Sequence, residues 1–253
     1  MRKAFALVLL LITSSAATVV AAPAVSQSTT CPAASPGRYV VMGQGIANGK
    51  PIARLLLEDW SADGRISGHR FNRDGLHFFE QSYSGNYRNL QNCLVEVTRQ
   101  NGDRQSRTHD VLDRQGKPRF ALSVTPGTIL SKRYWSQSVE KCQASDLDGV
   151  ILSQQTGLSW INNKWQPNAV VQREEWQAGL VEGLAIMSTN GTIEQVSYKG
   201  SIKVEPSCLA RVEEKDGKGV KYNYRAIVLS GGRGYIYLQS DAEDFTLGLL
   251  EKQ

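Results

Sequence analysis

The sequence predicts an all-β protein made of two tandem eight-stranded antiparallel up-and-down barrels. Signals for helices are nearly absent, whereas short runs of β-branched and aromatic residues, separated by Gly, Asn and Asp, recur roughly once every dozen residues. The same pattern of residues also occurs twice along the chain. Short connections favour antiparallel neighbours, and closing each set of strands on itself removes exposed sheet edges.

The internal repeat relates residues 58–97 to residues 174–212, at an offset of 115 or 116 positions. The recurring pairs are Trp60 and Trp176, Gly68 and Gly183, Gly75 and Gly191, Tyr83 and Tyr198, Gly85 and Gly200, and Cys93 and Cys208. Self-similarity of this kind indicates a duplicated domain. A residue that the shared architecture needs should recur in both copies, whereas a catalytic residue of one copy need not.

Eight strands are expected in each copy. Those of the first copy lie near Arg38–Gly43, Ile52–Trp60, Arg65–Phe71, Leu76–Tyr87, Cys93–Arg99, Arg104–Leu112, Arg119–Val124 and Ile129–Tyr134. Those of the second copy lie near Val150–Gln154, Val170–Gln177, Val181–Ser188, Thr192–Ile202, Cys208–Glu213, Tyr222–Leu229, Tyr235–Gln239 and Leu247–Glu251. A barrel of eight strands is just wide enough to be filled by side chains or to hold one small ligand. A sandwich of two sheets is the main alternative.

The chain is divided into a signal peptide at residues 1–24, a first barrel repeat at 31–137 and a second at 142–253. Basic Arg2 and Lys3, an apolar run and the small residues Ala22-Pro23-Ala24 predict the signal peptide. We expect a secreted or periplasmic protein with no membrane span after cleavage. Loss of Arg2 and Lys3 leaves 27 of the 29 basic residues against 24 acidic ones. These charges are scattered, which argues against a nucleic-acid partner.

Four cysteines follow the leader, and four allow three disulfide pairings. Each copy opens with one cysteine and carries a second at the equivalent later position. The repeat therefore predicts the disulfides Cys31–Cys93 and Cys142–Cys208. No metal or other cofactor is expected, because the sequence has no CxxC pair and no histidine cluster. The glycine-rich segment 231–234 joins two strands rather than opening a helix, so it is not a phosphate cradle.

The recurring glycines have local explanations. Gly75 and Gly191 follow Asp or Asn in tight hairpins, which need a positive φ. Gly85 and Gly200 lie inside expected strands, where glycine usually marks a bulge or a sharp bend at a barrel corner. Backbone kept clear for a ligand is the functional alternative at the last two positions.

The segments YSGNYRNLQNC (Tyr83–Cys93) and YKGSIKVEPSC (Tyr198–Cys208) carry a resemblance to a known group. Each follows a hairpin of the DG or NG type, and together they resemble the secreted bacterial proteins of the allene oxide cyclase barrel-like group, within the broader calycin or lipocalin-like barrels. The second copy departs from this pattern in having Ile202 where the first has Tyr87. The resemblance implies an eight-stranded barrel with an apolar cavity, and it brings no catalytic set with it.

No known catalytic motif occurs in either copy. The three histidines His69, His77 and His109 have no histidine counterpart in the second copy, so the shared architecture does not require them. Neither a Ser-His-Asp arrangement nor a GxSxG elbow accompanies them. A site unique to the first barrel is the functional alternative for these residues.

Glu58 with Trp60, matched by Glu174 with Trp176, is the only repeated pair with chemical potential. Residues two apart on a strand point to the same face. An inward face would place a desolvated carboxylate of raised pKa beside an aromatic wall, as an acid, base or ligand anchor. An outward face would leave ordinary surface residues. We favour the outward orientation, because lone glutamates are usually solvated.

The second copy also has Tyr222, Tyr224, Tyr235 and Tyr237 in i, i+2 pairs on successive strands. Aligned by the repeat, the first copy has His109, Phe120 and Leu122 at the last three of these positions. Such stripes more often pack a core than bind a ligand, but they predict that the two interiors differ in polarity. The candidate ligand-binding residues are Glu58, Trp60, Glu174, Trp176, Tyr224, Tyr235 and Tyr237.

The leading functional hypothesis is an exported, non-enzymatic protein that binds a small apolar or amphipathic ligand or a protein partner. An isomerase or cyclase that acts on a lipid-like substrate inside one barrel is the second hypothesis. A structural envelope-interaction module with filled barrels is the third. The size of the interior cavities separates the first two hypotheses from the third.

Overall fold

A computed structural model describes residues 31–102, 104–138 and 140–253 of the protein. Sixteen strands and two short 3-10 turns make up its regular structure, and these residues contain no α-helix. None of their helical segments is long and apolar enough to cross a membrane. The predicted signal peptide, residues 1–24, lies outside the described part of the chain.

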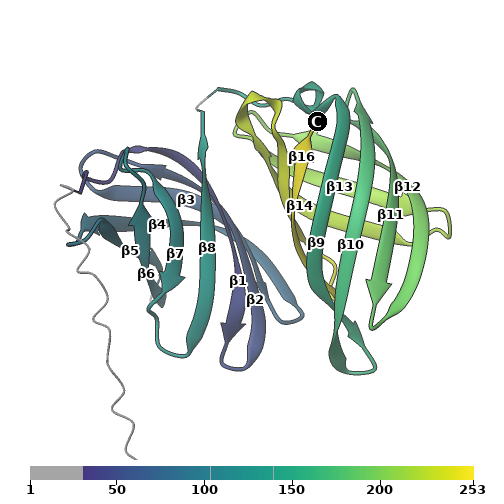
Figure 1. The fold of residues 1–253 in the computed structure, drawn as a ribbon, viewed down its shortest axis with the longest axis horizontal. Helices are drawn as coiled ribbons and strands as arrows, with labels where there is room; N and C mark the ends of the chain where they lie inside the picture. Colours follow the sequence, from purple (N-terminus) through teal and green to yellow (C-terminus); the bar gives the residue numbers. More distant parts are fainter. Residues whose placement is uncertain (1–30, 103, 139) are drawn as a thin grey trace, which may run out of the picture. The chain divides into compact units, whose positions relative to one another are not determined.

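The first eight strands form a closed antiparallel barrel in which each strand pairs with the next and the last pairs with the first (Figure 1). Their bounds are β1 Gly37–Ala47, β2 Lys50–Trp60, β3 Arg65–Asp74, β4 His77–Asn89, β5 Leu94–Asn101, β6 Arg104–Leu112, β7 Pro118–Ser123 and β8 Thr128–Gln137. A register shift between Val111 and Leu112 marks a bulge where β6 meets β7.

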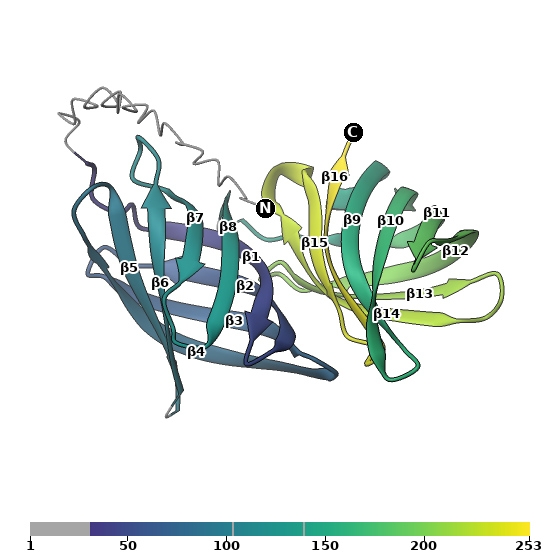
Figure 2. The ribbon, with the colours of Figure 1, turned by 60° about the horizontal axis from the view of Figure 1, so that its bottom comes forward.

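The last eight strands form a second closed barrel, which β16 completes by pairing with β9 (Figure 2). Their bounds are β9 Gly149–Ile161, β10 Lys164–Gln177, β11 Leu180–Thr189, β12 Thr192–Val204, β13 Leu209–Asp216, β14 Lys221–Leu229, β15 Gly234–Gln239 and β16 Asp244–Lys252. The 3-10 turns η1 (Ala144–Leu147) and η2 (Ser230–Gly232) precede β9 and β15. The prediction of two tandem eight-stranded barrels is therefore confirmed.

The hairpin of β9 and β10 is much longer than the sequence suggests. The expected strands stop at Gln154 and resume at Val170, whereas the real ones run to Ile161 and restart at Lys164. Asn162 and Asn163 both adopt positive φ, 51° and 59°, and form the two-residue turn between them. Asparagine tolerates this left-handed conformation better than most residues, so the pair works as a tight hairpin turn without glycine.

One end of each barrel is closed by packed aromatic rings and a disulfide. In the first barrel Tyr39, Trp60 and Tyr134 make edge-to-face contacts with centroids 5.4 to 6.2 Å apart. The disulfide Cys31–Cys93 attaches the segment before β1 to the β4–β5 loop at this end. In the second barrel Cys142–Cys208 forms the equivalent bond, so both predicted disulfides are confirmed.

Recurring glycines inside strands make room for neighbouring groups. A Cβ on Gly85 would lie 2.3 Å from the carbonyl oxygen of Thr98, and one on Gly200 would lie 2.4 Å from that of Glu213. The close backbone approach of the paired strand, rather than a ligand, therefore explains these two glycines.

Gly68 and Gly183 accommodate a tyrosine ring instead. A Cβ would lie 2.7 Å from the ring of Tyr83 at Gly68, and 2.2 Å from the ring of Tyr198 at Gly183. Each ring lies across its glycine on the adjacent strand, as the β3–β4 and β11–β12 registers require. The ring orientation matters because both phenol groups reach a buried carboxylate.

Outward-facing side chains of β1, β2 and β3 are also buried. Val40, Leu55 and Phe71 belong to one apolar cluster that includes residues of the second repeat. On the same face, the buried guanidinium of Arg73 donates hydrogen bonds of 2.5 to 3.2 Å to main-chain carbonyls between Ser240 and Asp244. The two repeats thus share a packed core in addition to their separate interiors.

Candidate functional site

A buried carboxylate lies at the centre of the first barrel. Glu58 on β2 is fully buried and points inward, together with Trp60 two residues later. Its Oε2 accepts a hydrogen bond of 3.0 Å from the Trp60 indole, and its Oε1 accepts one from the Tyr83 hydroxyl on β4. The outward, solvated orientation favoured from sequence is therefore wrong. Lone glutamates are usually exposed, but this carboxylate has partners that its local sequence does not show.

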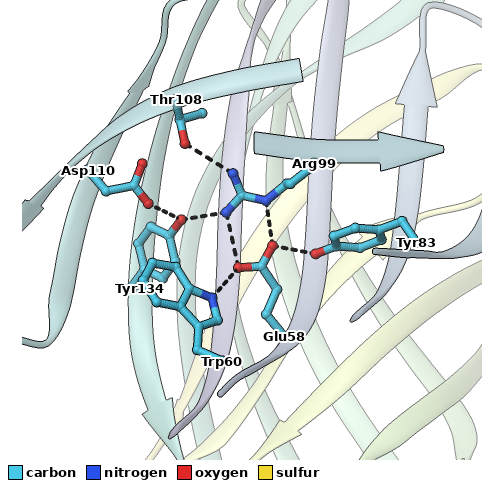
Figure 3. Close-up of polar contacts among 7 residues, drawn as sticks. All are labelled: Glu58, Trp60, Tyr83, Arg99, Thr108, Asp110 and Tyr134. Atoms are coloured by element: carbon cyan, nitrogen blue, oxygen red, sulfur yellow. Dashed lines mark hydrogen bonds and ion pairs between the residues drawn. The ribbon is translucent and has the colours of Figure 1, made fainter. Parts of the chain in front are cut away.

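Arg99 on β5 is the main partner of Glu58. Its Nε and one terminal nitrogen reach the two carboxylate oxygens at 2.5 and 3.0 Å, which is a bidentate ion pair with both side chains almost completely buried (Figure 3). Arg99 also donates to Thr108 at 3.0 Å and to the Tyr134 hydroxyl at 2.7 Å. Tyr134 in turn donates to Asp110 at 2.5 Å. Five strands, β2, β4, β5, β6 and β8, contribute to this one layer of polar side chains.

Opposite charge decides the ionisation of Glu58. Burial alone would raise its pKa, but the charge and hydrogen bonds of Arg99 outweigh burial and lower the pKa to about 2. Burial alone would lower the pKa of Arg99, but the charge and hydrogen bonds of Glu58, together with Tyr134 and Tyr83, outweigh burial and raise the pKa well above its usual value. Glu58 is thus a permanently charged structural anion rather than a general acid.

A cavity of about 610 Å³ lies on the other side of the Arg99 side chain. It reaches the barrel end that carries the β1–β2, β3–β4 and β5–β6 hairpins, opposite the disulfide. The lining residues are Ala47, Ile52, Arg54, Leu56, Arg70, Asn72, Asp74, Phe79, Gln81, Arg99, Asn101, Gln105, Ser106, Thr108, Ser123, Thr125, Thr128, Leu130 and Lys132. The volume falls within the range of about 300–1,000 Å³ that is typical of small-molecule sites.

Positive charge dominates this lining. It includes four cationic side chains, Arg54, Arg70, Arg99 and Lys132, and a single carboxylate, Asp74. Asp74 pairs with Arg54 at 2.6 Å. The guanidinium of Arg70 lies over the Tyr83 ring, 5.2 Å from its centroid, and has no carboxylate within 4 Å among the described residues. The cavity is therefore cationic, in contrast to the apolar cavity that the family resemblance implied.

Lys132 and Asn72 have hydrogen-bonding groups at this cavity without a protein partner among the described residues. Lys132 is 6% exposed and forms no hydrogen bond or ion pair with the described residues. Burial, and then the charge of Arg99, lower its pKa to about 7, so its ammonium loses its proton near neutrality. Neither the amide oxygen nor the amide nitrogen of the buried Asn72 has a partner within the described chain. Buried polar groups without partners are costly unless a ligand or water satisfies them.

The second barrel repeats the carboxylate but not its counter-ion. Glu174 on β10 is also fully buried, and it accepts hydrogen bonds from Trp176, Tyr235, Gln172 and Tyr198 at 2.6 to 3.0 Å. All four donors are neutral. Burial raises the pKa of Glu174, and these hydrogen bonds oppose the rise without reversing it.

The strand register identifies what replaces the cations. Arg99 lies across from Gly85 and Glu214 lies across from Gly200, so Glu214 occupies the position of Arg99. By the same comparison, Val170, Ala185 and Gly248 occupy the positions of Arg54, Arg70 and Lys132. Every cation that lines the first cavity is thus absent from the second, and one is replaced by an acid.

A smaller cavity of about 160 Å³ occupies the second barrel. Its lining residues are Gln155, Ser159, Asn168, Val170, Gln172, Ala185, Met187, Thr189, Val196, Tyr198, Glu214, Tyr222, Tyr224, Tyr237, Gln239, Asp244 and Thr246. The lining contains two carboxylates and no Lys, Arg or His. Burial and the charge of Glu174 raise the pKa of Glu214 well above its usual value, against a hydrogen bond from Tyr224.

Of the seven residues proposed from sequence, only Tyr224 and Tyr237 line an interior cavity. Glu58 and Glu174 lie in the layers beneath the cavities. Trp60 and Trp176 point to the closed ends, where each borders a separate surface depression. Tyr235 is buried against Trp176 and Glu174.

The sequence alignment of the tyrosines also needs correction. The β13–β14 hairpin is one residue longer than the β5–β6 hairpin, so Tyr224 corresponds to Thr108 rather than His109. Tyr237 corresponds to Ala121 rather than Leu122. Phe120, aligned with Tyr235, is 57% exposed on the outer surface.

The histidines do not contribute to either cavity lining. His109 lies on the outer face of β6, with its Nε2 3.6 Å from Glu96. Across residues 31–102, 104–138 and 140–253, no group of three or more His, Cys, Asp or Glu side chains is arranged to hold a metal ion.

Comparisons with known proteins identify no family. No family model matches the chain, and neither does any curated protein. Among solved structures, kievitone hydratase from Nectria haematococca is similar over 87% of this chain and 90% of its own, with 8% identity and a TM-score of 0.27. A protein of unknown function from the DUF3598 family of Nostoc punctiforme PCC 73102 is similar over 86% of this chain and 96% of its own, with 10% identity and a TM-score of 0.27. Similarity this low transfers neither activity nor ligand.

Proposed function

We propose that the first barrel binds a small amphipathic anion, with its anionic group at Arg70, Arg99 and Lys132. The observation that carries this proposal is the cation-rich cavity of about 610 Å³. Charge excess of this kind in a low-dielectric cavity attracts anions strongly, because water screens the interaction less than at a surface.

The state of each cation supports this assignment. The charge of Arg99 is already balanced by Glu58, and that of Arg54 by Asp74. Arg70 and Lys132 have no such balance at close range, so they are the cations with most to gain from an anionic ligand. A carboxylate or sulfonate matches the planar donor fork of arginine, and the unpaired amide of Asn72 offers a further donor.

The apolar part of the ligand is indicated by the other lining residues. Ile52, Leu56, Phe79 and Leu130 line the same cavity. A purely polar anion would leave these side chains in contact with water, whereas a short alkyl or aromatic group would cover them. The mixture of cationic and apolar side chains at this cavity therefore matches a fatty-acid-like or aromatic acid better than inorganic phosphate.

The test uses the full disulfide-bonded chain and the anionic fluorescent probe 8-anilinonaphthalene-1-sulfonate, with octanoate as competitor and octanol as its neutral counterpart. We expect octanoate to displace the probe at least tenfold more effectively than octanol. Arg70→Gln should weaken octanoate binding about tenfold, since one charged hydrogen-bond donor is worth about 1.5–3 kcal/mol. The matched control Arg65→Gln removes an arginine that is 80% exposed and should leave the affinity for octanoate unchanged.

Two results would overturn the proposal. One is equal displacement by octanoate and octanol, which would show that charge makes no contribution. The other is equal affinity of the Arg70→Gln and Arg65→Gln proteins for octanoate. Native mass spectrometry of the protein from its own host would add the identity of any ligand that remains bound.

An isomerase or cyclase reaction in the same cavity is the second candidate. Lys132 favours it, because a group whose pKa is about 7 can both accept and donate a proton near neutral pH. A loss of turnover of a bound acid in Lys132→Met that exceeds the loss of its binding would support catalysis over simple binding. The open cavity does not favour the third hypothesis, a module with filled barrels.

Two disulfides indicate an oxidising, extracytoplasmic environment. We further propose export by the predicted signal peptide, and membership of the allene oxide cyclase barrel-like group. The closed antiparallel meander of eight strands in each repeat supports that grouping. Detection of a mature N-terminus between residues 22 and 27 in the secreted or periplasmic fraction would test the export.

A further inference from the structure

We propose that the second barrel holds a separate site for a small organic cation, a quaternary or protonated amine, bound by Glu214 among tyrosine rings. The site is independent of the anion site proposed for the first barrel. It uses the cavity of about 160 Å³ that ends at Glu214.

The tyrosines provide the walls of this site. Tyr198, Tyr222, Tyr224 and Tyr237 all line the cavity, and the rings of Tyr224 and Tyr237 meet edge to face with centroids 4.7 Å apart. Aromatic faces carry negative charge density, so a cation held against them is attracted by about 0.5–2 kcal/mol per ring. The position of Tyr224 is Thr108 in the first barrel, and that of Tyr237 is Ala121, so these walls belong to the second barrel alone.

The cavity lining contains acidic residues but no Lys, Arg or His. Glu214 is 7% exposed and has no ion pair with any residue in the described part of the chain. Asp244 lies at the same cavity, where it accepts hydrogen bonds from Ser159 at 3.0 Å and Gln239 at 3.3 Å. Glu174 lies beneath and receives only neutral donors. Arg73 of the first repeat approaches Asp244 and donates to its main-chain carbonyl at 3.1 Å, but the cavity lining itself contains no Lys, Arg or His. A ligand cation would therefore balance Glu214 inside the cavity.

An unpaired acceptor points to the same ligand class. Gln155 is 6% exposed, and its amide nitrogen donates to Gln172, whose own amide nitrogen donates to Glu174. This chain of donors leaves the Oε1 atom of Gln155 at the cavity, where it has no partner within the described chain. Asn168 presents a second unpaired amide oxygen to the cavity. Acceptors without donors fit the N–H or polarised C–H groups of an ammonium ion.

The ionisation of Glu214 gives the site a measurable signature. Burial and the charge of Glu174 raise the pKa of Glu214 well above the usual range, which favours the protonated carboxylic acid in the empty site. A bound cation would favour the carboxylate and release a proton. Binding should therefore strengthen as pH rises, and the heat of binding should depend on the ionisation enthalpy of the buffer.

The size of the cavity limits the ligand. A volume of about 160 Å³ is close to that of an engineered cavity that holds benzene, about 150 Å³. A trimethylammonium group fits this space. Choline and its neutral isostere 3,3-dimethyl-1-butanol are therefore suitable probes, because they differ in charge and hardly in shape.

The experiment is calorimetric titration of the full disulfide-bonded chain with choline, at pH 6 and 8 in phosphate buffer and at pH 8 also in a second buffer that is not an organic cation and has a different ionisation enthalpy. We expect choline to bind at least tenfold more tightly than 3,3-dimethyl-1-butanol, with tighter binding at pH 8 and release of up to one proton. Glu214→Gln should weaken choline binding at least tenfold. The control Glu182→Gln removes an exposed carboxylate that pairs with Lys199, and should leave binding unchanged.

The outcomes separate the alternatives. Equal binding of choline and the isostere would overturn the proposal without use of any variant, so it remains testable if Glu214→Gln does not fold. Equal affinity of the Glu214→Gln and Glu182→Gln proteins would also overturn it. The Arg70→Gln protein should bind choline with the affinity of the parent protein. A weaker affinity in this variant would place the bound choline in the first barrel and would refute a site in the second. Failure of octanoate binding would not affect this result.

Discussion

Replacement of Arg99 by methionine isolates the ion pair at the centre of the first barrel. Methionine keeps most of the length of the side chain and removes its charge. Glu58 would then remain fully buried beside Trp60 and Tyr83 but without the cation that forms its ion pair. Removal of one partner from a buried ion pair typically costs about 3–5 kcal/mol, because the remaining charge has lost its compensation.

The pKa of Glu58 gives a second route to this magnitude. Its folded-state value of about 2 lies about 2.5 units below its unfolded value of 4.5. At about 1.36 kcal/mol per unit, the shift corresponds to about 3 kcal/mol of stability. Because the folded-state pKa is depressed, this contribution is fully present above pH 4.5 and is lost as pH falls through about 2.

Urea unfolding of the disulfide-intact protein, followed by tryptophan fluorescence, measures the effect. We expect Arg99→Met to be destabilised by about 3–5 kcal/mol at pH 7. At pH 3 the difference from the parent protein should be smaller by about 2 kcal/mol or more, since the parent loses part of its contribution and the variant protonates an unpaired acid. Glu58→Gln in the same chain should restore part of the loss, as a double-mutant cycle would show.

Arg88→Met is the matched control. Arg88 pairs with Glu96 at 2.8 Å, but it is 70% exposed, and such pairs contribute about 1 kcal/mol or less. Equal destabilisation by Arg99→Met and Arg88→Met would refute the reasoning. So would a difference between Arg99→Met and the parent protein that stays constant from pH 7 to pH 3.

Two further predictions concern single side chains. Urea unfolding gives the free energy of unfolding of Lys132→Met minus that of the parent protein. This difference should be about 2–3 kcal/mol more positive at pH 6 than at pH 9. The folded-state pKa of Lys132 is lowered to about 7 from 10.5, so burial of the charged ammonium destabilises the parent protein most below pH 7. The parent protein gains stability as pH rises above 7. A stability difference that stays constant between pH 6 and pH 9 would contradict the lowered pKa. Gly68→Ala and Gly183→Ala should each cost about 1–3 kcal/mol by thermal or urea unfolding, because the new methyl group displaces a tyrosine ring from its buried carboxylate. Gly217→Ala is the control, since no atom lies closer than 4.0 Å to its added Cβ, and equal effects at all three glycines would refute the steric argument.

The architecture follows from features that are local in the sequence. The hairpin turns, the repeat and its paired cysteines predict two closed barrels and both disulfides, which the structure confirms. The long β9–β10 hairpin was missed because its turn is an Asn-Asn pair, and glycine is the more familiar residue at positive φ. Strand periodicity fixes which residues share a face, but it does not indicate which face is inside.

Most of the cavity-lining residues could not be predicted because the sequence does not indicate which face of each strand points into the barrel. With Glu58 inside, the alternation of β2 also places Arg54 and Leu56 inside, and both line the cavity. The assumption that a lone glutamate is solvated therefore concealed Arg54 as well. The partner of Glu58 is 41 residues away along the chain and three strands away in the barrel. Only the comparison of Arg99 with Glu214 at the repeat offset could have drawn attention to it.

The two barrels treat the same buried carboxylate differently, and this difference separates architecture from ligand chemistry. The carboxylate, the indole two residues later, and the tyrosine lying across a glycine occur in both barrels. These groups therefore belong to the shared framework. The position of Arg99 and Glu214 is a cation in one copy and an acid in the other, and it borders the cavity in both. A framework that tolerates both charges at that position leaves the cavity lining free to differ, so the two interiors are expected to select ligands of opposite charge.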